Sequence, residues 1–394
     1  MGNDNIGDYR YIDTYEIVNS DGNPGTSFNN KGSESITWEK NTNFNAGVEF
    51  SLFKRVTGSF EYYRRKTTDM LFSFSVAPSL GYPSYYDNVG DMVNSGFELE
   101  MNINILRKKN INWDVFFNIA TVDNEIEMIH EDKKTSSIYD IDGKEYKGYN
   151  YKSFFITEGV SMYTWRLKKY AGVDKETGEA LYYKREAQEI KDKNGNPVLD
   201  KNGKPKTKMV NVKTAKYAEA DYFLIDGSTT IADFMGGFGT SVSAFGFDLS
   251  VNCSFQIGGK QYDGTYASFM GSPNANSIGG NYHADLKDAW TPANKNADIP
   301  RFCYGDLYTA ASSDRFLTDA SFLNIDNINF GYTIPAKLTK KFGVNSLRVY
   351  VSADNVFYWS KRQGFDPRQH LDGGSSAANY APMRTISGGV TVKF

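Results

Sequence analysis

Alternation of apolar and polar residues with a period of two, repeated along most of the chain, constrains the fold more than any other feature. At 97–105 the odd positions are apolar and the even positions are polar. The same pattern appears at 44–52, 247–257 and 386–394. Only an extended strand sends successive side chains to opposite faces, so each of these segments predicts a β-strand.

Ten strands account for this alternation and its interruptions. We expect them at about 6–19, 34–53, 54–75, 91–106, 111–124, 231–246, 246–260, 315–334, 345–360 and 384–394. The alternation changes phase within 323–332, which predicts a β-bulge there. The segment 125–230 has room for a further strand pair, for example around 161–170.

The connections between these strands fall into two classes of length. Short connections lie near 52–56, 106–112, 244–247 and 335–345, and long ones span about 20–33, 76–90, 125–230, 261–314 and 361–383. Short turns at one end of a sheet and long loops at the other are typical of outer-membrane β-barrels. If the C-terminus is periplasmic, every long loop faces the outside of the cell.

The alternation alone leaves a soluble β-sandwich open, because sandwich strands alternate too. A sandwich would present Lys and Glu to the solvent, whereas the polar face here is rich in Asn, Ser, Thr, Gly and Gln. Such a face suits a hydrated lumen. Aromatic residues also gather near the expected strand ends, at Tyr62, Phe72 and Trp359, as in the interfacial girdles of membrane proteins. We therefore predict an all-β fold, a transmembrane antiparallel β-barrel.

The last strand supports this prediction. Val390, Val392 and Phe394 occupy alternate positions up to the final residue. An alternating strand that ends in Phe matches the signal read by the barrel-assembly machinery, which we expect to be a partner of this chain.

Composition excludes several other classes of protein. The net charge of the 394 residues is −3, so no basic surface for nucleic acid is expected. There is no apolar run of 18 residues that would make a transmembrane helix, and the first residues do not resemble a signal peptide. Three scattered histidines, at His130, His283 and His370, fit neither a catalytic triad nor a metal site. We expect no enzyme activity, metal or cofactor.

Three smaller motifs have structural interpretations. The glycines of 236–239 do not complete a dinucleotide fingerprint and lie within an expected strand. The short repeat at 192–205 lacks the pattern of a calcium loop, and its Asn-Gly pairs predict two hairpin turns in an external loop. Cys253, on an apolar strand face, and Cys303, in a long loop, are expected to be inert and not bonded to each other.

The sequence resembles the C-terminal barrel portion of SusC/RagA-type TonB-linked outer-membrane proteins along most of its length. The matching segments, in order, are 2–7, Thr37-Trp38-Glu39-Lys40, 43–48, 60–71, 88–98, 170–178, 247–250, 322–335, 346–357, 364–367 and 384–385. Their order and spacing carry the resemblance, since each motif is short.

The resemblance implies a 22-stranded barrel, an N-terminal plug and a TonB box that couples uptake to the TonB-ExbB-ExbD complex. It also implies a SusD-like lipoprotein that captures an oligosaccharide or peptide outside the cell. We expect residues 1–394 to be the C-terminal part of such a barrel, with the plug, TonB box, signal peptide and other half of the barrel missing. An open barrel edge is not tolerated in lipid, so this part would need the missing half to close.

Ligand contacts are expected from aromatic residues in the external loops, because flat rings stack on sugars. The candidates are Tyr82, Tyr85, Tyr86, Trp290 and Phe365. The same rings could instead pack loop against loop or against a lid. The alternative to transport is a soluble sandwich or propeller module that binds glycans at the cell surface.

Overall fold

The computed structural model describes residues 8–82, 84–194, 196–275, 279–369 and 381–394. Its strands are β1 (Thr14–Ser20), β2 (Asn23–Asn30), β3 (Lys40–Leu52), β4 (Val56–Ser75), β5 (Ser84–Lys108), β6 (Ile111–Ala120), β7 (Asp123–Ile129), β8 (Ser136–Tyr139), β9 (Glu145–Tyr151), β10 (Phe154–Thr157), β11 (Thr164–Lys168), β12 (Tyr170–Val173), β13 (Ala180–Glu189), β14 (Thr207–Thr214), β15 (Tyr222–Thr229), β16 (Phe234–Ala244), β17 (Phe247–Ile257), β18 (Lys260–Tyr262), β19 (Leu317–Asp319), β20 (Phe322–Ile334), β21 (Ser346–Ser360) and β22 (Thr385–Lys393). The α-helices are α1 (Gly264–Phe269) and α2 (Ala336–Thr339). None of the described helices is both long and apolar enough to cross a membrane.

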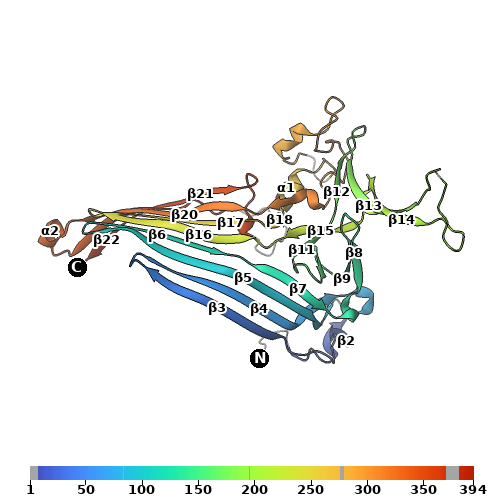
Figure 1. Cartoon of the computed structure of the whole chain (residues 1–394), viewed down its shortest axis with the longest axis horizontal. Coiled ribbons are helices and arrows are strands. Elements are labelled where there is room, and N and C mark those ends of the chain that lie inside the picture. The colour runs from blue at the N-terminus through green and yellow to red at the C-terminus, as the bar shows by residue number, and fades with distance from the viewer. Residues whose placement is uncertain (1–7, 83, 195, 276–278, 370–380) are drawn as a thin grey trace.

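One large antiparallel sheet, called the wall below, dominates the structure (Figure 1). Its strands follow the order β22-β21-β20-β17-β16-β6-β5-β4-β3, and β7 pairs with β5 beyond the end of β6. Successive strands are joined mostly to their neighbours in sequence, as in an up-and-down barrel. The predicted all-β barrel fold is confirmed.

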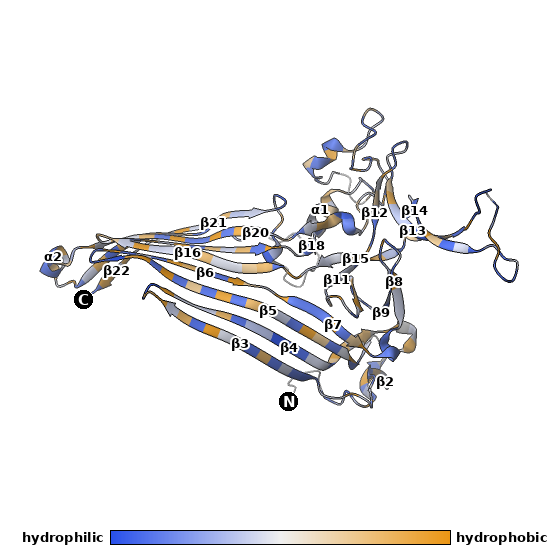
Figure 2. Ribbon diagram, viewed as in Figure 1, coloured by the Kyte–Doolittle hydropathy of each residue, from blue (hydrophilic) through white to orange (hydrophobic). Residues whose placement is uncertain are grey.

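The two faces of the wall differ in chemistry, as the alternating colours along β3, β4 and β5 show (Figure 2). Apolar side chains on one face are open: Phe44, Val48, Phe60 and Phe97 are 46–63% exposed. On the other face polar side chains bond to each other across strands, for example Asn104 to Asp114. Neighbouring strands that each expose large apolar groups form a surface suited to lipid rather than water.

The change of phase in the sequence does mark a β-bulge. The register of β20 shifts at Asp326, between Ile325 and Asn327, relative to both of its neighbouring strands, β17 and β21. Asp326 accepts a hydrogen bond from the Ser254 hydroxyl at 2.9 Å. The extra residue is thus held by its own side chain.

Short turns gather at one end of the wall. Phe53 and Lys54 between β3 and β4, and Phe245 between β16 and β17, have positive φ, which lets the chain reverse tightly. The C-terminus and α2 lie at this same end, and the long connections lie at the other (Figure 1). The short connections expected near 52–56, 106–112, 244–247 and 335–345 do join wall strands, whereas the long connection expected at 20–33 instead holds β2, which follows β1 after two residues.

Three expectations about the strands are wrong in detail. The strand expected at 6–19 is not part of the wall: its described portion contains β1, which pairs only with β2. The long connection expected at 76–90 is shorter, because β5 begins at Ser84. The segment 125–230, expected as a long connection with room for one strand pair, holds most of β7 and all of β8–β15, and β11 lies within the suggested 161–170.

The segment from β8 to β15 folds into a compact unit, called the loop assembly below. Strands β10, β11, β15, β8 and β9 close on themselves, and β12, β13 and β14 form a second small sheet. The side chains of Phe155, Trp165 and Phe223 are at most 2% exposed. Much of the buried core therefore lies beyond the wall rather than in it.

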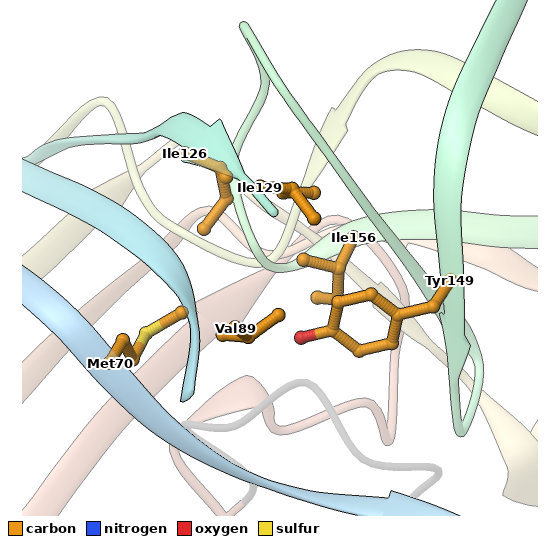
Figure 3. Close-up of a cluster of buried hydrophobic side chains, with 6 residues drawn as sticks. All are labelled: Met70, Val89, Ile126, Ile129, Tyr149 and Ile156. Atoms are coloured by element: carbon orange, nitrogen blue, oxygen red, sulfur yellow. The ribbon is translucent and has the colours of Figure 1, made fainter. Parts of the chain in front are cut away.

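An apolar cluster fixes the loop assembly to the wall (Figure 3). Met70 and Val89 come from the ends of β4 and β5, and Tyr149 and Ile156 come from β9 and β10. Their side chains converge with those of β7 in one group, which joins elements far apart in sequence. Burial of this group favours a fixed position of the loop assembly over the end of the wall.

Candidate functional site

The polar face of the wall is a continuous surface of bonded side chains. Arg348 of β21 donates to Asp248 of β17 through Nε at 3.0 Å, and to Asn329 of β20 through its second nitrogen at 2.6 Å. Asn327 donates to Asp354 at 2.6 Å. Each contact crosses between strands, so these residues tie the wall together and also make its inner surface hydrophilic.

The tyrosines expected in one loop lie largely in a strand. Tyr85 and Tyr86 belong to β5, and Tyr82 precedes it. Tyr85 stacks on Phe74 with ring centroids 5.5 Å apart, and Tyr82 lies 5.4 Å from the ring of Phe28. The three tyrosines are half-buried and part of the packing between the N-terminal hairpin and the wall.

Trp290 and Phe365 lie in two other places. The Trp290 indole donates to the Lys175 carbonyl at 3.0 Å, and its ring covers Gly178. Phe365 is 4% exposed, and its carbonyl accepts a hydrogen bond from the Tyr358 hydroxyl at 3.2 Å. The structure therefore distributes the five aromatic candidates among three packing clusters, and their contact with ligand stays a prediction.

The residues of the expected barrel-assembly signal lie on the open apolar face. Val390 and Val392 of β22 are 60% and 42% exposed, and Phe394 is 86% exposed. Their accessibility suits recognition by another protein, which also stays a prediction.

A buried ion pair anchors the segment between the wall and the loop assembly. The ammonium of Lys133 contacts the carboxylate of Asp87, and both residues are less than 10% exposed. Burial disfavours the charged lysine, but its hydrogen bonds to Asp87 and Asp132 outweigh burial, so the pKa of Lys133 is raised. The rings of Phe74 and Tyr85 lie 5.6 and 5.8 Å from the ammonium.

A cavity of about 300 Å³ opens where β7 leaves β6 and the loop assembly meets the wall. Asp123, Glu125 and Asp233 line it on the wall side. Ser228 lines it from the loop assembly, and its buried hydroxyl has no hydrogen-bond partner among the described residues. Most of the side chains that line the cavity are polar.

The residues that line this cavity were not expected, because only one further strand pair, around 161–170, was suggested within 125–230. β11 lies in that stretch. In Thr164–Lys168 apolar Trp165 and Leu167 alternate with Arg166 and Lys168, the pattern used elsewhere to predict strands. The two turns expected within 192–205 are confirmed, since Lys191 pairs with Pro197 and Leu199 with Pro205. Both cysteines are free.

Comparison with known proteins supports the same fold. Residues 3–356 match the family described as TonB dependent receptor-like, beta-barrel. The chain is 25% identical to TonB-dependent receptor P3 of Formosa agariphila and 26% identical to TonB-dependent receptor SusC of Bacteroides thetaiotaomicron. All of this chain is covered in both, but only 38% and 36% of the relatives' own lengths.

A solved structure of the RagAB peptide transporter has the same fold. Its TM-score is 0.80 at 24% identity, over 100% of this chain and 40% of the solved chain. The RagAB peptide importer in its closed-closed state gives 0.78 at the same identity and coverage. This chain thus spans about two fifths of the length of the proteins it matches.

Proposed function

Because this chain belongs to the TonB-dependent receptor-like β-barrel family, we propose that it forms part of an energy-coupled importer. The family's barrels are outer-membrane proteins, and this chain is one of them. Its relatives are transporters and receptors rather than enzymes. Within the importer, the proposed role of the chain is to supply barrel wall and external loops.

The contrast between the two faces of the wall carries this proposal. Exposed Val349 and Val351 alternate along β21 with Arg348 and Tyr350, whose side chains belong to the polar face. A wall that is apolar outside and hydrogen-bonded inside separates lipid from a hydrated lumen. The loop assembly then lies over the outer end of that lumen, where a ligand would enter.

The open edges of the wall support a larger barrel. Among the described residues, β3 pairs only with β4 and β22 only with β21. An unpaired edge in lipid leaves backbone groups without hydrogen bonds, at a cost of several kcal/mol for each group. We propose that further strands of the importer, together with a plug, complete the barrel between β3 and β22.

The partners and ligand follow from the same proposal. A SusD-like lipoprotein would cover the loop assembly, and the TonB-ExbB-ExbD complex would supply energy through the plug. The ligand would be an oligosaccharide or a peptide, as the family resemblance implies, and a peptide transporter, RagAB, shares the fold. Tyr82, Tyr85, Tyr86, Trp290 and Phe365 remain the proposed aromatic contacts.

Uptake by intact cells tests the proposed function. Deletion of the gene should abolish accumulation of one labelled oligosaccharide or peptide from a defined panel. Complementation should restore it, and a protonophore should stop it within minutes. Alanine at Trp290 should slow uptake, whereas alanine at Tyr304, a loop residue that is 62% exposed, should not. Uptake of every panel member at wild-type rates in the deletion strain would contradict the proposal.

A further inference from the structure

The loop assembly contains a second and larger cavity, of about 530 Å³, and none of the residues that line it belongs to the wall. β8 contributes all four of its residues, Ser136–Tyr139, to the lining, and β9 contributes Asn150. The remaining lining comes from β11, β13, β14 and from Asp221 and Tyr222 at the start of β15. Strands from both small sheets thus converge on one polar cavity, called the arginine pocket below.

Two arginines define the chemistry of this pocket. Arg166 of β11 lies over the ring of Tyr222 at 3.9 Å, and Arg185 of β13 lies over the ring of Tyr139 at 3.3 Å. All four residues line the pocket. Stacking on an aromatic face holds a guanidinium in a fixed plane and leaves its N–H groups free at the edge.

Neither guanidinium is neutralised within the described part of the chain. The hydrogen bonds recorded for Arg166 and Arg185 come from their backbone N–H groups, to Ser153 and to Asp221. No ion pair with a described carboxylate includes either arginine, although most other partly buried cations of the loop assembly and its surroundings have one. Both arginines are partly exposed at the pocket, so their N–H groups are accessible to an acceptor that enters it.

Asp221 also lines the pocket, but no ion pair joins its carboxylate to either guanidinium among the described residues. Its Oδ2 accepts a hydrogen bond from the backbone N–H of Arg185 at 2.6 Å. Lys168, which is 7% exposed, lies beside the pocket lining, with its ammonium 5.5 Å from the Tyr222 ring and bonded to the Tyr217 carbonyl at 2.5 Å. Burial lowers the pKa of both Arg166 and Lys168. An incoming anion would stabilise the charged form of each group.

We propose that the arginine pocket binds the carboxylate of a small acidic solute. A guanidinium group matches the geometry of a carboxylate, which accepts paired hydrogen bonds from it, and this pocket offers two such groups. The hydroxyls of Ser136 and Ser137 and the amide of Asn150 are then placed to bond the rest of the solute. The carboxylate could belong to an acidic sugar or to an acidic amino acid, which the experiment below separates.

This inference needs only a folded loop assembly and does not depend on import. The test is titration calorimetry on the protein purified from outer membranes in detergent, in a buffer free of sulfate and phosphate. The probes are D-glucuronate and N-acetyl-L-glutamate. Their neutral counterparts are D-glucose and N-acetyl-L-glutamine. At least one acid should bind while its neutral counterpart does not, and the acid that binds identifies the class of ligand.

Variants then locate the binding site. Arg166→Gln and Arg185→Gln should each weaken binding of the acid by at least about tenfold, as expected for loss of a charge-assisted hydrogen bond. Lys208→Gln removes an exposed charge from β14 outside the pocket lining, and should leave the affinity within about twofold. Equal heats for acids and neutral counterparts, or wild-type affinity in both arginine variants, would overturn the proposal.

A measurement on the wild-type protein guards against variants that do not fold. Phenylglyoxal modifies free guanidinium groups, and mass spectrometry reports the extent at each arginine. The acid that binds should protect Arg166 and Arg185, while exposed Arg107 should react equally with and without it. Absence of protection at both pocket arginines, at a saturating concentration of the acid, would also overturn the proposal.

Discussion

At the scale of single residues, glycines leave room for bulky side chains of neighbouring strands on the inner face of the wall. Gly239 of β16 lies where a Cβ would be 2.4 Å from both the Phe116 ring and the Val251 carbonyl. At Gly331 a Cβ would likewise be 2.4 Å from the guanidinium of Arg348. The glycines within these strands are therefore required by close packing rather than by turns.

Replacement of Gly239 by alanine should destabilise the protein by about 1–3 kcal/mol, because neither the carbonyl nor the ring can easily move. The control is Gly388→Ala, where the nearest neighbouring atom lies 3.8 Å from the new Cβ. Urea unfolding of the two variants in detergent measures both effects. Equal stability of the two variants would show that the inner face is not closely packed at Gly239.

The buried pair of Lys133 and Asp87 should contribute more than any exposed pair. Lys133→Met leaves the Asp87 carboxylate buried without its cation and should cost about 3–5 kcal/mol. Lys134→Met, which breaks contacts with exposed Glu131 and Glu158, should cost under about 1 kcal/mol. The free energy of unfolding of each variant, measured with urea, checks this.

The same pair makes a prediction about pH. Because the pKa of Lys133 is raised above its ordinary value of 10.5, the stability it contributes is complete below that pH. It is lost as the pH rises through the higher pKa of the folded protein. The difference in stability between wild type and Lys133→Met should therefore shrink at strongly alkaline pH, and a constant difference would contradict the assignment.

At the scale of elements, the cluster around Ile156 couples the loop assembly to the wall. Ile156→Ala should cost about 2–5 kcal/mol of local stability, because a fully buried side chain leaves a cavity. Hydrogen exchange in β8–β11 should rise while exchange in β16 and β17 stays unchanged. Ile190→Ala, at a position that is 39% exposed, is the control and should change neither. Uniform acceleration in both regions would mean that the loop assembly is not a separate unit.

Alternation predicted the wall strands well because burial on a sheet has a period of two, and 97–105 lies in β5 as expected. The start of β5 was missed because Asp87, Asn88 and Gly90 are typical of turns. In the structure the Asn88 side chain bonds to the backbone of Thr37 and Asp69, which stabilises a turn-like sequence as a strand. Such contacts, 19 and 51 residues away in sequence, leave no local signal.

The candidate sites were harder to predict than the wall. Arg166 and Arg185 become a pair only because Tyr222 and Tyr139, from different strands, hold them in one pocket. The spacing of Arg166 and Arg185 in the sequence does not indicate that they share a pocket. Aromatic residues in long connections could be identified, but whether a ring such as Phe365 is buried depends on tertiary packing.

At the scale of the whole molecule, the tight turns that join wall strands lie at one end and the loop assembly lies at the other (Figure 1). This polarity fixes an orientation in the outer membrane, with the loop assembly outside the cell. An epitope inserted between Asn202 and Gly203, an exposed turn, should be labelled on intact cells. The same epitope between Lys109 and Asn110 should be labelled only after the outer membrane is permeabilised. The reverse result would contradict the orientation.

The central claim is that one face of the wall meets lipid and the other meets water. Spin labels placed singly at each position of 97–105, in protein reconstituted into lipid vesicles, test it most directly. Collision with oxygen should be greatest at Phe97, Leu99 and Met101, and collision with a water-soluble nickel chelate should be greatest at the positions between them. Access of the chelate to both faces alike, or an absence of period-two variation, would contradict the account.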